Sequence, residues 1–367
     1  MEPLKYMYDR RFATHFAGIA KGILPSFRDK EFVNAVMASG WDDLELKQRV
    51  DRLSSALHQV LSGDFREDIP VVVSFANAVM DSTGRQNTFE YIFLPGFVAL
   101  FGVDYPEESL QAMAVLTRLS SCEFAIRPFL IRYPDRTIAE MMKWTEHHHP
   151  SVRRLASEGC RPRLPWGVAL PQFKKDPSMI LPILERLKDD TSEFVRRSVA
   201  NNLNDIAKDH PHIVLSIAGR WKGNSADTDR LIRHACRNLL KKADPAALAL
   251  FGLTTTPGCS VEELKLKGQN IRIGDTLHFS FQVRTNEEHS GPLRLEYVIT
   301  YAKANNKFSD KVFQIAEGVF SPGQVVTYSR KQSFADMTTR KHYAGEHRIA
   351  VTVNGVPMAA ASFMVEQ

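Results

Sequence analysis

The sequence predicts a multidomain protein in which an α-helical repeat solenoid is followed by an all-β sandwich. Three observations carry this prediction. Apolar residues recur with a helical period up to about Leu253, and apolar and polar residues alternate in short runs after Pro257. A short motif with arginines also recurs inside the helical part. A chain of 367 residues is long enough for two or three such domains.

The helical pattern is clearest in residues 45–61, where the apolar positions follow a period of 3.6. This stripe consists of Val50, Leu53, Leu57, Val60 and Leu61. Further helical runs cover residues 109–121, 137–148, 178–189 and 193–209. Short breaks that contain Pro, Gly or Asp separate them, which is typical of stacked helices joined by short loops.

The segments HHHPSVRRLASEGC, TSEFVRRSVANNLND and DTDRLIRHACRNLLKK share an apolar-Arg pair followed by small apolar residues. Arg154, Arg197 and Arg233 occupy equivalent positions, 43 and 36 residues apart. HEAT and armadillo repeats are about 40–47 residues long, so the first spacing fits and the second is short. We expect residues 116–130 to form the corresponding inner helix of the preceding repeat. Residues 1–253 are therefore predicted to be a HEAT-like repeat domain whose inner helices line a concave groove.

The C-terminal part contains about seven short alternating runs rich in β-branched and aromatic residues. They cover residues 261–267, 277–285, 294–303, 309–318, 325–334, 347–355 and 360–366. Turn signals separate several of them, among them Gly291–Pro292, residues 321–323 and Asn354–Gly355. This pattern predicts an immunoglobulin-like sandwich over residues 261–367, with residues 254–260 as the linker.

Composition excludes several classes of protein. No run approaches the roughly 20 apolar residues of a membrane helix, and the N-terminus lacks the order of a signal peptide. The four cysteines are far apart and form no CxxC pair, which argues against a disulfide scaffold or a zinc cluster. We therefore expect a cytoplasmic monomer that does not contact membranes. The net charge of +5 permits a polyanionic partner without singling one out.

Cofactor and metal motifs are missing from the sequence. There is no Walker loop, GxGxxG turn or HExxH pair. His147, His148 and His149 are consecutive at a helix boundary, so their side chains point in different directions and cannot all bind one ion well. We expect neither a metal nor an organic cofactor.

One run carries most of the functional information. In residues 156–167, ASEGCRPRLPWG, a helix ends in a basic, proline-framed loop that contains a tryptophan. This run resembles the signature of the AlkC branch of the AlkD-like DNA alkylation-repair glycosylases. The N-terminal helices, the CEF segment around Glu123, the helix of residues 193–208 and the C-terminal sandwich extend the resemblance over essentially the whole chain.

The resemblance implies hydrolysis of the N-glycosidic bond of alkylated bases in double-stranded DNA. The implied substrates are 3-methyladenine, which the family shares, and 3-methylcytosine. The repeat groove would hold the duplex backbone without flipping the base. By motif match, Glu123 and Glu158 are the acidic groups beside the damaged nucleotide and Trp166 is the aromatic one. The chain departs from AlkD-like relatives at residues 201–203, Asn-Asn-Leu, where they have a second tryptophan.

These residue types suit the chemistry. A base methylated at N3 is cationic and already a good leaving group, so positive charge builds up on the sugar in the transition state. A carboxylate beside C1′ opposes that charge, and a second one orients and deprotonates water. The face of Trp166 can contact the sugar or the cationic base. Asp205 is a candidate third acidic group near the substrate, although a solvated helix residue fits it equally well.

Arg154 lies one helical turn before Glu158, which places a candidate phosphate-binding arginine beside a candidate catalytic carboxylate. Arg161 and Arg163 follow in the loop. Contacts to phosphates position a protein on DNA in any sequence context. We therefore predict that these three arginines bind DNA.

Arg197 and Arg233, at the equivalent positions of the later repeats, are predicted to bind DNA as well. The alternative is structural. In HEAT repeats such arginines often pair with an aspartate of the neighbouring repeat, and Asp190 and Asp227 are available for this.

Two other functions remain open at this point. A non-catalytic HEAT scaffold that binds DNA or protein needs no pair of acidic residues beside a tryptophan. An enzyme that prefers 7-methylguanine would differ only in its substrate. The sandwich carries basic segments at residues 303–307 and 340–342, which we expect to contact DNA phosphates; a domain that only stabilises the solenoid or binds a protein is the alternative.

Overall fold

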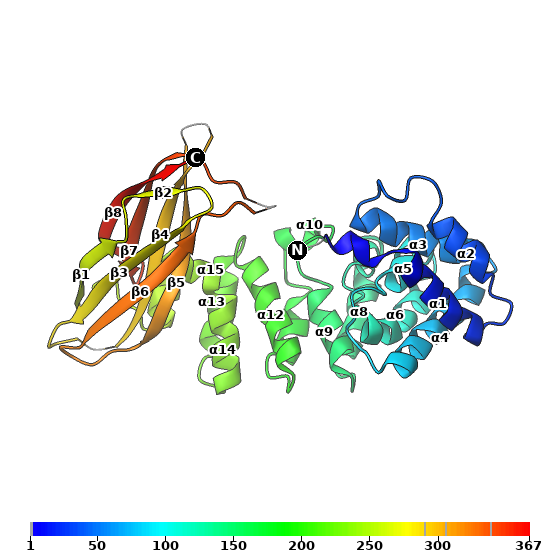
Figure 1. Ribbon diagram of the computed structural model, residues 1–367. Coiled ribbons are helices and arrows are strands. Elements are labelled where there is room, and N and C mark those ends of the chain that lie inside the picture. The colour runs from blue at the N-terminus through cyan, green and yellow to red at the C-terminus, as the bar shows by residue number, and fades with distance from the viewer. Residues whose placement is uncertain (1–2, 290, 305–306, 338–339) are drawn as a thin grey trace. The chain divides into compact units, whose positions relative to one another are not determined.

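The computed structural model describes the whole chain except residues 1–2, 290, 305–306 and 338–339 (Figure 1). Helices occupy the first part and strands the last, as the sequence predicts. The chain forms two compact units. We call them the helical unit, which comprises Met1–Val214 and Trp221–Ala235, and the sandwich unit, which comprises Leu215–Arg220 and Cys236–Gln367.

The helices of the described residues follow a short 3₁₀ turn at Leu4–Met7. They are α1 (Arg10–Ile23), α2 (Asp29–Val36), α3 (Leu46–Val60), α4 (Phe65–Thr83), α5 (Phe93–Phe101), α6 (Pro106–Leu119), α7 (Arg127–Arg132), α8 (Pro134–Trp144), α9 (Pro150–Glu158), α10 (Pro171–Lys175), α11 (Leu181–Leu187), α12 (Glu193–Ile206), α13 (Pro211–Trp221), α14 (Ala226–Ala235), α15 (Arg237–Lys241) and α16 (Pro245–Leu250). No helix of the described residues is both long and apolar enough to cross a lipid bilayer.

The predicted HEAT-like repeat is confirmed in the helical unit. The inner helix α12 packs against α9 on one side and against α14 on the other, so the three arginine-bearing helices stack in sequence (Figure 1). Helix α9 starts at Pro150, whose missing N–H costs nothing in a first turn. His149 caps it, because its Nδ1 accepts a hydrogen bond from the Ser151 amide at 3.2 Å.

The prediction of one inner helix over residues 116–130 is wrong. Helix α6 ends at Leu119, and Ser120 is extended with φ −143° and ψ 134°. Helix α7 begins only at Arg127, with Pro128 in its first turn. Two serines and a proline therefore interrupt an otherwise apolar run. Glu123 consequently lies in the turn between two helices, not on a helix.

The strands pair into a sandwich of two sheets. They are β1 (Cys259–Leu266), β2 (Asn270–Arg272), β3 (Thr276–Thr285), β4 (Pro292–Ala302), β5 (Phe308–Val319), β6 (Val325–Ser333), β7 (Gly345–Val353) and β8 (Val356–Glu366). One sheet has the order β1-β3-β6 and the other β2-β8-β7-β4-β5. All seven predicted strands are present. The sequence analysis missed β2, a three-residue strand that pairs parallel to β8.

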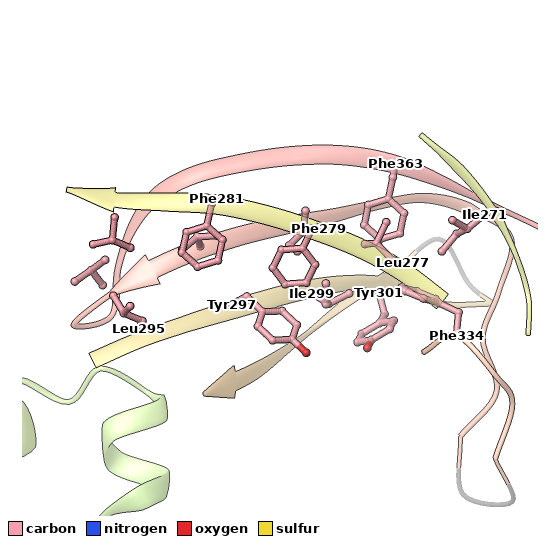
Figure 2. Packing of buried hydrophobic residues seen from close by; sticks show 14 of the residues in the cluster. Ile271, Leu277, Phe279, Phe281, Leu295, Tyr297, Ile299, Tyr301, Phe334 and Phe363 are labelled. Carbon is pink, nitrogen blue, oxygen red and sulfur yellow. The ribbon is translucent and has the colours of Figure 1, made fainter. Parts of the chain in front are cut away.

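Alternating residues of the two sheets meet in one core (Figure 2). Phe279 of β3 meets Tyr297 of β4 edge-on, with ring centroids 5.0 Å apart. Along β3, the side chains between the core positions point away from the core and are more exposed. This alternation explains why a period of two was visible in the sequence.

Helices α15 and α16 group with the sandwich rather than with the repeats. The cause is the tight turn between β7 and β8, where Asn354 and Gly355 both have positive φ. The Asn354 side chain is buried, accepts a hydrogen bond from the Arg294 amide at 2.8 Å and donates one to the Thr254 carbonyl at 2.9 Å. This turn holds the segment after α16 against the sandwich, just before the strand that starts at Cys259.

Candidate active site

The helical unit contains a cleft of about 440 Å³ that brings together residues from distant parts of the sequence. Glu123 comes from the turn after α6, Glu158 from the end of α9 and Trp166 from the loop before α10. Arg154, Arg161 and Phe194 are among its other lining residues. The three residues on which the expected chemistry depends thus face one space.

Arg154 links the two glutamates. Its Nη1 donates to Glu123 Oε2 at 2.9 Å, and its Nη2 lies 3.6 Å from Glu158 Oε1. Ser121 Oγ donates to the same Glu123 oxygen at 2.9 Å. No hydrogen bond within the described part of the chain reaches Glu123 Oε1. One oxygen of Glu123 is therefore anchored and the other is available in the cleft.

Glu158 is only 4% exposed, yet it lines the cleft. Arg161 Nη1 donates to its Oε1 at 2.6 Å, while Arg161 Nε donates to Asp205 Oδ2 at 2.9 Å. Burial alone lowers the pKa of Arg161, but the charges of the two carboxylates and their hydrogen bonds raise it above its ordinary value. Lys208 Nζ donates to Asp205 Oδ1 at 3.0 Å. The result is a chain of alternating charges that runs from the cleft through the buried Arg161 and Asp205 to the exposed Lys208.

Two predicted site residues, Arg161 and Asp205, belong to this chain of charges. Arg161, expected on a surface that contacts DNA, does line the cleft, but its side chain is only 9% exposed and holds two carboxylates. Asp205 was expected near the substrate, but it is buried on α12 and is not among the residues that line the cleft. Arg163 lies farther out and pairs with Asp209, with Nη2 2.8 Å from Oδ1.

A ladder of ion pairs, each between an arginine of one repeat and an aspartate of the next, is present in the structure. It uses the first arginine of each Arg-Arg pair. Arg153 Nε donates to Asp190 Oδ2 at 2.6 Å, and Arg196 Nη2 lies 3.0 Å from Asp227 Oδ2. The second arginines point elsewhere: Arg154 into the cleft, and exposed Arg197 into a separate depression of about 290 Å³.

Arg233 of α14 is half-buried and lies outside the depression that Arg197 lines. The residues of α14 that line this depression include Arg230, Leu231 and His234. The three arginines that look equivalent in the sequence therefore have three different surroundings.

Trp166 is 62% exposed and has a left-handed backbone conformation with φ +63°, which is rare for a residue other than glycine. Lys47 Nζ of α3 donates to its carbonyl oxygen. The indole meets Phe89 edge-on, with ring centroids 6.5 Å apart. The loop thus presents a large aromatic face at the mouth of the cleft.

Among the described residues, no three His, Cys, Asp or Glu side chains are grouped so that they could hold a metal ion. Cys160, two residues after Glu158, is fully buried, and burial raises the pKa of its thiol to about 12. Its thiolate is therefore scarce at neutral pH.

Comparison with known proteins decides the family. Residues 119–239, which contain the cleft glutamates and the tryptophan, match a family described as "DNA alkylation repair enzyme". The solved structure of the Pseudomonas fluorescens alkylpurine DNA glycosylase AlkC, bound to DNA containing an abasic site analog, is 35% identical and covers 100% of both chains with a TM-score of 0.93. The chain belongs to the AlkC-type DNA alkylation-repair glycosylases.

Two further matches agree with this family. Residues 260–367 match the C-terminal Ig-like domain of the uncharacterised protein YhaZ. YhaZ of Bacillus subtilis (strain 168) is 39% identical over 365 residues and covers 100% of both chains. The immunoglobulin-like nature of the predicted sandwich is thereby confirmed.

In this AlkC-type chain the sequence analysis missed Phe194, which lines the cleft together with Trp166, Phe89 and Phe124. Asn202 and Leu203 are buried, and Asn202 Nδ2 donates to the Ser157 carbonyl at 2.8 Å, so neither can form a wall of the cleft. Phe194, at the start of α12, is 39% exposed and lines the cleft. The Arg154 guanidinium lies 4.5 Å from its ring centroid. The signal available in the sequence was that Phe194 precedes Val195, an apolar residue of the buried helix face, and so lies about 100° away from that face.

Proposed function

We propose that this glycosylase hydrolyses the N-glycosidic bond of cationic N3-methylated bases in double-stranded DNA. The proposed substrates are 3-methyladenine and 3-methylcytosine. The observation that carries the proposal is the meeting of Glu123, Glu158 and Trp166 in one cleft. The AlkC of Pseudomonas fluorescens, named an alkylpurine DNA glycosylase, supports the purine substrate, 3-methyladenine.

In the proposed mechanism, each glutamate has a separate task. Glu158 is nearly closed to solvent, so its charge is weakly screened and opposes the positive charge that develops on the sugar. Glu123 has more solvent around it and one oxygen without a hydrogen bond among the described residues, so it orients and deprotonates the attacking water. The cationic base leaves without needing a proton.

The aromatic side chains recognise the damaged nucleotide. Trp166 contacts the sugar or the cationic base, and a cation over an indole face is worth about 0.5–2 kcal/mol. Phe194, on the other side of Arg154, is the proposed second wall. Both rings are exposed, and we propose that they contact a nucleotide that stays in the duplex, so that excision needs no base flipping.

Arg154 is the proposed link between DNA binding and chemistry. Its guanidinium already neutralises Glu123 and lies near Glu158. A DNA phosphate would take over part of this interaction and leave the carboxylates facing a cationic sugar. Arg163, Arg197 and Arg233 are proposed to contact further phosphates, which positions the enzyme in any sequence context. The proposed working form is a monomer that acts on DNA in the nucleoid.

The test is an excision assay on duplexes that each contain one lesion, either 3-methyladenine, 3-methylcytosine or 7-methylguanine. Glu123→Gln and Glu158→Gln keep the size of each side chain and remove its charge. We expect each to lower the single-turnover rate by about 10² to 10³, as for the loss of one transition-state partner. Glu146→Gln is the matched control, because Glu146 is exposed and pairs only with Arg186 far along the sequence.

Three outcomes discriminate between the functions. Release of the two N3-methylated bases, abolished in the cleft variants alone, supports the proposal. A preference for 7-methylguanine keeps the mechanism and changes the substrate. Binding of damaged DNA without release of any free base would contradict catalysis and indicate a non-catalytic scaffold.

A further inference from the structure

Arg127 is a buried charge that the proposed chemistry does not use. It lies in the first turn of α7, is 1% exposed, and lines neither the active-site cleft nor any ladder between repeats. Within the described part of the chain, no carboxylate lies within ion-pair distance of it. Burial is the main cause that lowers its pKa to about 10, so it remains a cation at neutral pH. An unpaired buried cation is costly and requires a compensating set of hydrogen bonds.

That compensation comes entirely from main-chain carbonyls of the loop that follows α9. Nη1 donates to the Gly159 carbonyl at 3.0 Å and Nη2 to the Arg161 carbonyl at 3.0 Å. Nε donates to the carbonyl of Val168. Two of the partners precede Trp166 and one follows it. A single planar side chain thus joins the two ends of the loop that presents the tryptophan.

The packing around the loop leaves little room for it to shift. A Cβ added at Gly159 would lie 2.7 Å from Ile126 Cγ2, and one at Gly167 would lie 3.0 Å from Leu164 Cδ2 and 3.3 Å from Arg127 Cδ. The left-handed backbone of Trp166 costs energy and persists only where its surroundings hold it. Arg127 supplies three of the contacts that hold it.

We infer that Arg127 is a positioning residue, which sets the place of Trp166 at the cleft by holding both ends of its loop. The inference rests on the proposed function in one respect, namely that Trp166 contacts the damaged nucleotide. Arg127 itself touches neither DNA nor the reacting atoms. Lysine cannot replace it, because one ammonium group on a flexible stem cannot bridge three carbonyls in a plane.

The test uses Arg127→Lys in the full-length chain. The chain has four tryptophans, and Trp41, Trp144 and Trp221 are buried, so quenching of fluorescence by acrylamide reports mainly on Trp166. We expect altered quenching of Trp166 and a single-turnover rate that falls by about 2- to 30-fold at most, the range expected when the tryptophan contact itself is lost. Affinity for undamaged DNA should stay within about twofold. Arg153→Lys is the matched control, because Arg153 is also a partly buried arginine but belongs to the ladder with Asp190.

A double-variant cycle separates positioning from general stability. If Arg127 acts through Trp166, Arg127→Lys should lose most of its effect on the rate in a Trp166→Ala background. Should Arg127→Lys fail to fold, Gly167→Ala displaces the same loop from its other side and is expected to change quenching and rate in the same direction. Unchanged quenching, or losses that multiply independently, would overturn the inference. A normal rate in Trp166→Ala alone would instead contradict the proposed function, while the quenching comparison would still judge the role of Arg127.

Discussion

The guanidinium of Arg161 lies 2.6 Å from Oε1 of Glu158, and both side chains are nearly closed to solvent at the end of α9. The same guanidinium holds Asp205 from α12. Arg161 is thus the positive centre between two buried carboxylates. A residue so placed stabilises and orients an acidic group of the cleft, and it has little surface left with which to contact a phosphate.

Arg161→Ala is therefore predicted to lower the stability of the protein and the rate of excision more than its affinity for DNA. Removing one member of a buried ion pair typically costs about 3–5 kcal/mol, because the partners remain charged and uncompensated. We expect a loss of this size in chemical denaturation. The salt dependence of binding to undamaged DNA should stay as in the wild type. A slope lower by about 0.9 would show that Arg161 does contact a phosphate.

Trp166→Ala is predicted to lower excision of 3-methyladenine without destabilising the protein. The side chain is mostly exposed, so its removal leaves no cavity in the core. Loss of a cation–π contact of about 0.5–2 kcal/mol corresponds to a rate lower by roughly 2- to 30-fold. The measurements are single-turnover rates and thermal melting. A much lower melting temperature would mean that the tryptophan caps the repeat core after all.

Arg153, the first arginine of one pair, and Arg197, the second arginine of the next, are predicted to differ in their effects on stability and on DNA binding. Arg153→Ala breaks the contact with Asp190 and should lower stability, with little effect on affinity for DNA. Arg197→Ala changes an exposed side chain that lines a depression, so stability should stay within about 0.5 kcal/mol. If Arg197 contacts a phosphate, its loss lowers the salt slope by about 0.9. If Arg197→Ala instead lowers stability and leaves the salt slope unchanged, Arg197 has a structural role.

How far the sequence alone predicts this molecule depends on the range of the interactions involved. Strand β3 was visible because its 10 residues alternate between core and surface, and β4 alternates in the same way from Tyr297 onward. Strand β2 has only three residues and exists because β8, far along the chain, pairs with it. No local pattern of that length distinguishes a strand from a loop.

The same limit applies to the site. Trp166 was placed in a loop because of the prolines beside it, which is local information. The burial of Arg161 depends on Asp205, 44 residues away, and a basic residue in a loop ordinarily points to solvent. The role of Arg127 depends on carbonyl groups, which every residue carries and which therefore leave no trace in the sequence.

The sandwich is predicted to lose stability as the pH falls below about 6.5, the ordinary pKa of histidine. Burial lowers the pKa of both His347 and His342, so the fold favours the neutral form of each. The unfolded chain binds protons that the native state does not, and stability therefore decreases with falling pH in this window. Arg340 beside His342 acts in the same direction, whereas Asp336, 3.4 Å from His342 Nδ1, opposes it.

Thermal melting of the wild type at pH 7.5 and 5.5 measures this effect. His347→Gln keeps a hydrogen-bonding side chain near the Tyr343 carbonyl but does not titrate. We expect a smaller decrease in melting temperature for this variant than for the wild type. An equal decrease in both proteins would assign the pH dependence to other groups.

The basic surface of the sandwich unit is predicted to contribute to DNA binding. Lys303, Lys307 and Lys341 line a depression of about 620 Å³, together with Arg340 and Tyr343. Of the basic segments predicted from the sequence, Asn305 and Asn306 lie outside the described residues, and His342 is buried and points away from solvent.

Replacing the three lysines by glutamine removes charge without altering the core of the sandwich. The slope of log affinity against log salt should fall by about 0.9 for each lysine that contacts a phosphate. At saturating enzyme, excision of 3-methyladenine should persist, because the cleft belongs to the helical unit. Lys265→Gln is the control, since Lys265 is exposed on β1 and pairs with Glu263. An unchanged slope in the triple variant would rule out a phosphate-binding role for this surface and favour a sandwich that stabilises the repeats or binds a protein.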